Sequence, residues 1–238
     1  VSRKIKRRNS ISELFMILIF ALATLVASQV SPVLESSIDL LGVDQTGKLL
    51  LWHPMIAAQN DGRLSSTKIK SERESLYSDM KSSWKVNRGE LTATGDGCGI
   101  ETMFVVRNHI WETKWRVSSG SEVVLYLRGT PAIRLRDSRN RIDASFGLGS
   151  GGLFLNKYYR AHPMVFADKP ISEWNDLKVI EKEDRVTVVL NGINVVDAVP
   201  LEPFWRRTKP LPIEGSLGLG SVRGMAQFRS MRVTPLSD

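Results

Sequence analysis

The sequence contains very few of the residues that build disulfide frameworks and metal centres. Its 238 residues include one cysteine, Cys98, and three histidines, His53, His109 and His162. A single thiol excludes an internal disulfide network and a zinc site built on paired cysteines, and the scattered histidines lack the spacing of metal-binding motifs. No cofactor is evident, and a divalent cation would have to be held by oxygen ligands.

An apolar run long enough to span a membrane is also missing. The main apolar stretch, Leu14–Ala27, has fourteen residues with only Thr24 polar, whereas a transmembrane helix needs about 20. It follows the basic segment Arg3–Arg8 and ends in small residues, as a secretory signal does. We expect residues 1–28 to be a signal helix or, alternatively, an uncleaved anchor. Either way, the body is expected to be secreted, periplasmic or in the cell envelope.

The excess of positive charge is modest once this leader is set aside. The formal net charge is +8, and residues 1–28 account for +4, which leaves 28 basic against 24 acidic residues in the body. That balance does not favour a phosphate-binding surface. We therefore expect no nucleic-acid partner, and membrane contact only through an uncleaved leader.

Helical periodicity is weak after Ser83, where short β-branched and aromatic runs alternate with Gly, Asn and Pro. This pattern is typical of many short strands. In Trp111–Val117, bulky residues alternate with charged ones, which predicts a strand with one buried face. Val123–Leu127 and Ile133–Arg136 follow, on either side of a predicted turn at Arg128–Pro131.

The clearest local prediction is a hairpin. The runs Arg185–Leu190 and Ile193–Val199 are rich in β-branched residues and are separated by Asn191-Gly192. Asn-Gly is the preferred two-residue type I′ loop because both central residues take positive φ. The sequence therefore predicts two antiparallel strands joined at this point.

Many short strands without interleaved helices predict an all-β fold, an antiparallel two-sheet sandwich of jelly-roll type. We expect this domain to occupy residues 81–238. Residues 29–80 are polar and weakly patterned, and we interpret them as a linker and loop with one early strand near Leu49–Trp52.

A series of short motifs runs through the predicted sandwich. In order they are Ser83–Leu91, Gly149–Leu153, Ala167–Pro170, Glu173-Trp174-Asn175, Asp184–Val188, Leu190-Asn191-Gly192, Val195–Asp197 and Phe228-Arg229. Together they resemble the 3-keto-disaccharide hydrolase domain family, over roughly Trp84 to Leu236. The resemblance implies a concanavalin A-like, laminin G-like jelly roll that acts on glycosides oxidised to a ketone at C3.

The sequence departs from that family in two places. Its opening strand survives only approximately, as Gly47–Trp52. In the late strand, the positions at which the family usually has Gln and His hold Gly220 and Val222. A proton-transfer or metal-ligating group at those positions is therefore absent from this chain.

The chemistry implied by the resemblance is elimination rather than ordinary glycoside hydrolysis. A ketone at C3 acidifies the hydrogen on C2, so a base can remove it, the C1 substituent can leave, and water can then add. This route needs a base and a group that stabilises the enolate oxygen. The candidates are Asp168 or Glu173 as base and Arg128 as electrophile, with Asp137, Trp205 and Asn156 as substrate-binding residues.

Each candidate has a structural alternative. Arg128 can be a solvated charge at a strand end, Asp168 and Asp137 can cap loops, and Glu173 can pair at the surface. Trp174 fits a buried core position better than a sugar platform, the Asn191-Gly192 and Gly149–Gly152 segments fit structural roles, and His109 and His162 fit surface or half-buried positions.

Two functional hypotheses remain open: an exported enzyme that cleaves 3-keto-glycosides, with an oxidised glycoside as its partner, and a non-catalytic lectin-like module of the same fold. The sugar, its linkage and the oligomeric state do not follow from the sequence.

Overall fold

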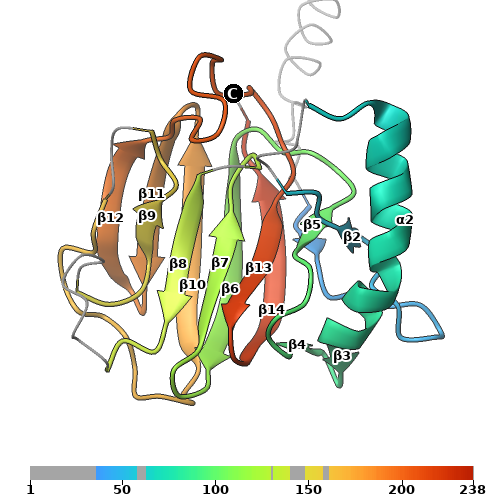
Figure 1. The fold of residues 1–238 in the computed structure, drawn as a ribbon. Coiled ribbons are helices and arrows are strands. Elements are labelled where there is room, and N and C mark those ends of the chain that lie inside the picture. Colours follow the sequence, from blue (N-terminus) through green and yellow to red (C-terminus); the bar gives the residue numbers. More distant parts are fainter. Residues whose placement is uncertain (1–35, 58–62, 130, 140–147, 158–160, 238) are drawn as a thin grey trace, which may run out of the picture. The chain divides into compact units, whose positions relative to one another are not determined.

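The computed structural model describes residues 36–57, 63–129, 131–139, 148–157 and 161–237. In this part of the chain, two antiparallel sheets lie face to face and one helix, α2, flanks them (Figure 1). The prediction of an antiparallel two-sheet sandwich is confirmed. The all-β prediction needs one correction, because α2 was not expected. The predicted signal helix falls outside the described residues.

The larger sheet has the order β12-β11-β10-β6-β14-β4-β3, and β1 also pairs with β14. Its strands are β1 (Ile38–Asp39), β3 (Trp84–Asn87), β4 (Glu90–Ala93), β6 (His109–Val117), β10 (Asn175–Lys182), β11 (Arg185–Leu190), β12 (Ile193–Pro200) and β14 (Ala226–Pro235).

The smaller sheet has the order β2-β5-β13-β7-β8-β9. Its strands are β2 (Trp52–Pro54), β5 (Ile100–Thr102), β7 (Glu122–Tyr126), β8 (Ala132–Arg136), β9 (Gly152–Phe154) and β13 (Gly218–Arg223).

The core lies between the two sheets and follows the predicted alternation. Along β6, Trp111, Thr113, Trp115 and Val117 are buried, and the residues between them are half-buried on the outer face. The inner faces of β7 and β8 contribute aliphatic side chains in the same way. Burying these apolar surfaces is the main favourable contribution to folding.

The predicted hairpin is present. β11 and β12 are antiparallel, and Leu190 pairs with Ile193 across the turn. Asn191 and Gly192 have φ angles of 50° and 82°, the left-handed values that a type I′ loop requires.

Replacing Gly192 by valine is expected to lower the free energy of unfolding by about 1–2 kcal/mol, because a β-branched residue resists positive φ. No atom outside the neighbouring residues lies within 4 Å of a Cβ built at this position, so the effect isolates backbone strain. Gly192→Asn is the matched control and should cost less, since Asn tolerates this conformation. Denaturant unfolding measures both, and equal stabilities of the valine variant and the wild type would contradict the turn.

The segment before residue 83 was predicted to be linker and loop, but it contains a helix. Helix α2 spans Ser66–Ser83, and the Ser65 side chain caps it by accepting a hydrogen bond from the backbone N–H of Lys68. The helix contacts β2 and β3. Arg73 of this helix forms an ion pair with Glu101 of β5. The amphipathic pattern of α2 was hard to recognise because this charged residue stands at an inward position, where an apolar residue would be expected.

The expected early strand is β2, slightly later than predicted, and β1 precedes it. Residues 38–39 pair with β14, and residues 52–54 pair with β5. This part of the predicted linker therefore contributes to both sheets. Among the described residues, no helix combines the length and the apolar character needed to cross a membrane.

Cys98 is a free, half-buried thiol. Burial, together with the nearby Asp79 carboxylate, raises the pKa of this thiol to about 12. The backbone around it is fixed, because Asp79 accepts a hydrogen bond from Cys98 N at 2.7 Å and Trp84 donates its indole N–H to Cys98 O at 2.7 Å. A thiol with such a pKa is a weak nucleophile at neutral pH.

Candidate functional site

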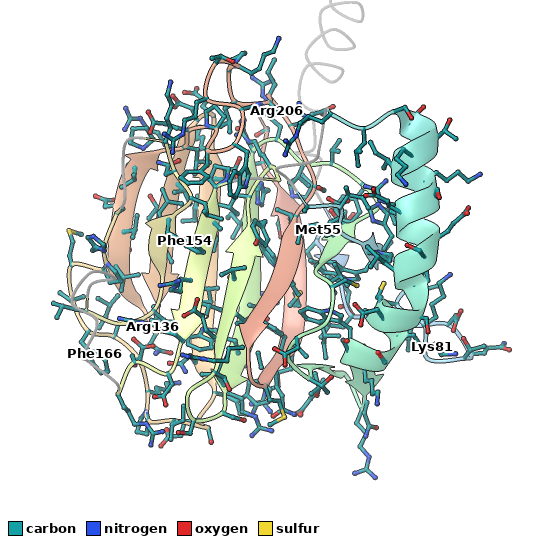
Figure 2. The ribbon with its side chains drawn as sticks, in the orientation of Figure 1. Met55, Lys81, Arg136, Phe154, Phe166 and Arg206 are labelled. Carbon is teal, nitrogen blue, oxygen red and sulfur yellow. The ribbon has the colours of Figure 1, made fainter. Side chains whose placement is uncertain are left out.

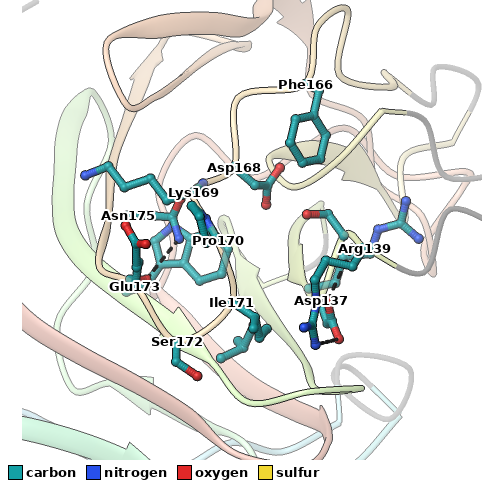
Figure 3. Close-up of a pocket in the computed structure, with 14 residues that line it drawn as sticks. Asp137, Arg139, Phe166, Asp168, Lys169, Pro170, Ile171, Ser172, Glu173 and Asn175 are labelled. Carbon is teal, nitrogen blue, oxygen red and sulfur yellow. Dashed lines mark hydrogen bonds and ion pairs between the residues drawn. The ribbon is translucent and has the colours of Figure 1, made fainter.

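A cavity of about 320 Å³ opens at the end of the sandwich where β6 and β8 end and β10 begins. Residues 136–139 form one wall, and the segment 166–175 forms the other (Figure 3). In Figure 2, Arg136 and Phe166 lie towards this end of the molecule. Three residues predicted from the sequence, Asp137, Asp168 and Glu173, line the cavity together.

Asp168 is the most deeply placed of the three carboxylates. Its Oδ2 accepts a hydrogen bond from the backbone N–H of Ser150 at 2.9 Å. Its Oδ1 is buried and has no hydrogen-bond partner among the described residues. Burial raises the pKa of this carboxyl, although hydrogen bonds from Ser150 and Ser138 oppose the shift. A desolvated carboxylate with a free lone pair suits proton abstraction.

The glycine-rich segment makes room for this carboxylate. Gly149 has a φ of 125°, and a Cβ at that position would lie 2.3 Å from Asp168 Oδ2. Any other residue would therefore displace Asp168 as well as strain the backbone. The predicted structural role of Gly149–Gly152 thus includes positioning a candidate catalytic group.

Asp137 lines the cavity and also stabilises a turn. The two roles considered from the sequence, substrate binding and capping of a loop, are therefore compatible. Its Oδ2 accepts a hydrogen bond from Gly120 N at 2.9 Å, and Arg139 Nε donates to its Oδ1 at 3.0 Å. The hydrogen bonds from Arg139 lower the pKa of Asp137 to about 2. Asp137 is therefore ionised and too weak a base for this chemistry at neutral pH, but it can accept hydrogen bonds from sugar hydroxyls.

Glu173 lies at the cavity rim and is exposed. The segment around it is fixed by two amides that sequence reasoning did not identify as partners. Asn175 Oδ1 accepts hydrogen bonds from Lys169 N and from Asn191 Nδ2, both at 2.8 Å, and Asn191 Nδ2 also donates to Ala167 O. The hairpin turn therefore holds the wall of the cavity in place.

Arg128 is not at the cavity, and its prediction as the electrophile of this site is corrected. Its side chain is 4% exposed and forms an ion pair with Glu181, which is 0% exposed. It also donates hydrogen bonds to the backbone carbonyls of Glu183 and Pro212. The Arg128 guanidinium therefore binds groups of the protein interior. A charged residue can occupy this buried position after β7 because Glu181 and two backbone carbonyls pair with it.

His109 belongs to the same interior cluster, whereas a surface or half-buried position was expected. It is fully buried, and its Nε2 lies 3.9 Å from Glu181 Oε2. Burial lowers the pKa of His109 to about 4 and raises that of Glu181 to about 7.

The two other predicted binding residues also lie away from the cavity. Asn156 clamps a backbone segment, since its Nδ2 donates to Pro200 O at 2.7 Å and its Oδ1 accepts from Glu202 N at 2.6 Å. Trp205 is 44% exposed and meets the ring of Phe204 edge to face, with 4.8 Å between centroids. Only Trp205 keeps a side chain that a ligand could reach.

Trp174 is half-buried, which corrects its interpretation as a core residue. Its ring has the guanidinium groups of Arg116 and Arg229 at 4.4 Å and 4.2 Å from the centroid. Cation–π contacts of this kind stabilise partly exposed aromatic rings.

The two positions at which the family usually has Gln and His, Gly220 and Val222, lie in β13, which contributes none of the described residues that line the cavity. Gly220 is in β13 opposite Val124 of β7, on the face opposite to that of the core residues Leu219 and Leu125. A Cβ at Gly220 would lie 3.0 Å from Tyr126 Cε2 and 3.1 Å from Val124 Cγ2. These neighbours crowd the space into which a longer side chain would extend. The side chain of Val222 lies outside the described part of the chain.

A smaller cavity of about 190 Å³ is lined by Arg134, Phe154, His162 and Phe204, among others. The Arg134 guanidinium lies 4.8 Å from the centroid of the Phe154 ring. Figure 2 places Phe154 on the smaller sheet, away from the end where Phe166 lies. Among the described residues, no group of three or more His, Cys, Asp or Glu side chains is arranged to hold a metal ion.

The fold defines a class of protein, the antiparallel two-sheet β-sandwich. The particular family follows from a family model, described as a 3-keto-alpha-glucoside-1,2-lyase-like domain, which matches residues 58–234. The chain belongs to this family. A search of curated proteins finds no match.

Two solved structures with TM-scores of 0.50 or more support the fold. These crystal structures from Parabacteroides distasonis, both provisionally described as glycosyl hydrolases, have TM-scores of 0.52 and 0.50 at 16% and 17% identity. Each match covers 65% of this chain, and they cover 84% and 91% of the other chains respectively. The carbohydrate-binding module CBM66 from Bacillus subtilis has a TM-score of 0.44 at 14% identity, over 63% of this chain and 90% of that one.

Proposed function

We propose that this protein is an exported enzyme that cleaves 3-keto-glycosides by elimination, with Asp168 as the base. The observation that carries the proposal is the carboxylate of Asp168. This residue lines a sugar-sized cavity, and its buried Oδ1 has no hydrogen-bond partner among the described residues. The family match supplies the class of substrate. Export is proposed from residues 1–28 of the sequence alone.

In the proposed reaction, a lone pair on Asp168 takes the C2 proton, and the electrons of the C–H bond form an enolate with the C3 carbonyl. The enolate then re-forms the ketone and expels the substituent at C1 with the C1–O electron pair. The departing alkoxide takes up the proton that Asp168 had removed, which regenerates the carboxylate. Water adds to the resulting double bond and completes net hydrolysis. Asp168 becomes neutral in the first step, which its desolvated surroundings favour.

The cavity wall supplies groups for the other requirements of this route. Arg136 and Arg139 line the wall formed by residues 136–139 and provide positive charge there, which suits stabilisation of the enolate oxygen. Phe166, Pro170 and Ile171 provide apolar contact surface. Ionised Asp137 accepts hydrogen bonds from hydroxyl groups, which orients the sugar.

The purified protein is expected to release the aglycone from a 3-keto-glucoside and to leave the unoxidised glucoside intact, because only the ketone acidifies the C2 hydrogen. Chromatographic detection of the aglycone from both compounds measures this discrimination. Cleavage of both glucosides at similar rates would contradict the elimination route. Turnover of neither, with or without added divalent cations, would contradict the enzyme proposal.

The second candidate function is a lectin-like binding module. The smaller cavity favours it, since Phe154 and Phe204 offer apolar ring surface beside Arg134, and no carboxylate of the described residues lines it. Sugar binding that persists in a protein with no turnover, and that is lost on Phe154→Ala, would support this function over catalysis.

A further inference from the structure

The outer face of the larger sheet carries a regular arrangement of charged side chains. Lys114 of β6 pairs across the sheet with Asp176 of β10 and with Arg229 of β14, and Arg229 pairs with Glu90 of β4. One row along the strands, Glu112 pairs with both a lysine and an arginine in the same way. Because directly paired residues share a face, these side chains all lie on one surface.

Each carboxylate on this surface is shared between two cations. Asp176 pairs with Lys114 and, at 3.4 Å, with Lys169. Glu112 pairs with Lys178 at 3.3 Å and Arg232 at 2.9 Å, and Glu90 pairs with Arg116 at 3.7 Å and Arg229 at 3.8 Å. We call these nine residues the basic face. Its six cations and three anions leave an excess of three positive charges. The charge of residues 29–238 as a whole, by contrast, is nearly balanced.

The cations of the basic face are accessible and partly fixed. Their side chains are between 31% and 55% exposed. Arg116 and Arg229 are also held against the ring of Trp174. Side chains that are already ordered lose less conformational entropy when they bind a ligand.

The composition of the basic face discriminates between polyanions. Across the strands, Lys114 and Arg229 are direct neighbours about 5 Å apart, whereas Lys178 and Arg232 are separated by Glu112 and lie about 10 Å apart. Carboxylates are therefore interleaved with the cations. Duplex DNA carries a charge about every 1.7 Å of its axis, and such a dense array would be repelled by the three carboxylates. A polymer with sparser charge and many hydroxyls fits better, because its anions meet cations and its hydroxyls donate to carboxylates.

A membrane surface fits less well. Binding to a bilayer surface depends on apolar side chains that insert, in addition to charge. Of the large apolar side chains that are well exposed in the described part of the chain, none lies on β4, β6, β10 or β14.

We propose that the basic face binds an acidic polysaccharide, which carries one anionic group per sugar at intervals along a hydroxyl-rich chain. This inference rests on the proposed function and names the polymer class that the enzyme approaches. Lys169 connects the two regions, since it lines the large cavity and pairs with Asp176 of the basic face. A polymer held on the basic face therefore passes beside the cavity rim.

The test removes the excess charge without leaving any carboxylate unpaired. In the variant Lys114→Gln/Arg229→Gln/Arg232→Gln, each of Asp176, Glu90 and Glu112 keeps one cation. The variant is expected to bind polygalacturonate about tenfold or more weakly than the wild type in affinity electrophoresis at low salt. Neutral dextran should bind neither protein through this face.

The matched control removes the same charge from α2, in Lys68→Gln/Lys70→Gln/Lys81→Gln, where all three side chains are exposed. It should bind polygalacturonate as the wild type does. An equal loss in the control would show that net charge alone matters, and would overturn the inference. Tighter wild-type binding to duplex DNA or to vesicles containing phosphatidylglycerol than to polygalacturonate would overturn the choice of partner.

Turnover of a small 3-keto-glucoside separates this inference from the proposed function. The triple variant is expected to keep the wild-type rate, because none of its three positions lines the cavity. Polymer binding without any turnover would refute the enzyme and leave the basic face supported. Turnover without polymer binding in the wild type would refute the basic face alone.

Discussion

Replacing Asp168 by asparagine is expected to lower kcat on a 3-keto-glucoside by about 10²-fold or more, with KM nearly unchanged. The amide keeps the shape of the side chain and can still accept the hydrogen bond that Ser150 N donates to Oδ2. It removes the basic lone pair that takes the C2 proton. Steady-state kinetics on the wild type and the variant measure the effect.

The pH profile distinguishes a base from a merely structural carboxylate. Burial raises the pKa of Asp168 above its ordinary value of 3.8, so the wild-type rate should increase with pH through that raised pKa. The residual rate of the variant should lack this step. Glu173→Gln, at the exposed rim, is the matched control and should change the rate little. The reverse pattern would assign the base to Glu173.

Replacing Arg128 by methionine is expected to lower the free energy of unfolding by about 3–5 kcal/mol. The reason is that Glu181, at 0% exposure, would lose its cation. The difference from the wild type should widen above pH 7, because wild-type Glu181 ionises at about 7, whereas without Arg128 its pKa rises further and ionisation continues to destabilise the folded state. Denaturant unfolding at several pH values measures this.

The double variant Arg128→Met/Glu181→Leu is the companion test. With both charges removed, most of the lost stability should return, since an apolar pair of similar volume avoids burying an unpaired ion. A double variant as unstable as Arg128→Met would mean that the hydrogen bonds from Arg128 to Glu183 O and Pro212 O carry the stability instead.

The sandwich could be predicted because the sequence patterns that specify its strands and turns involve residues close together in the chain. The period-2 alternation of β6 and the Asn-Gly turn between β11 and β12 each depend on residues close together in the sequence. Helix α2 was missed for the opposite reason. Its inward face includes Arg73, whose partner Glu101 lies 28 residues away, so the apolar pattern that identifies amphipathic helices is interrupted.

The candidate site could be predicted only in part. Asp168 and Glu173 were candidates because they lie in motifs that resemble the family, and Asp137 was a candidate because it follows a predicted strand. The fold brings all three to one cavity. Arg128 was misassigned because nothing near it in the sequence reveals Glu181, which is 53 residues away. The role of Gly149 depends on a 2.3 Å approach to Asp168, a relation that only the folded chain shows.

The bond between Asn175 and Asn191 has an evolutionary consequence. It joins the Glu173-Trp174-Asn175 motif at the cavity to the Leu190-Asn191-Gly192 motif at the hairpin turn. Because Asn191 also donates to Ala167 O, a chain that changed its turn would lose the support of the segment that carries Asp168. Selection on catalysis would then act on a turn that never touches substrate, and the two motifs should be retained or lost together among relatives.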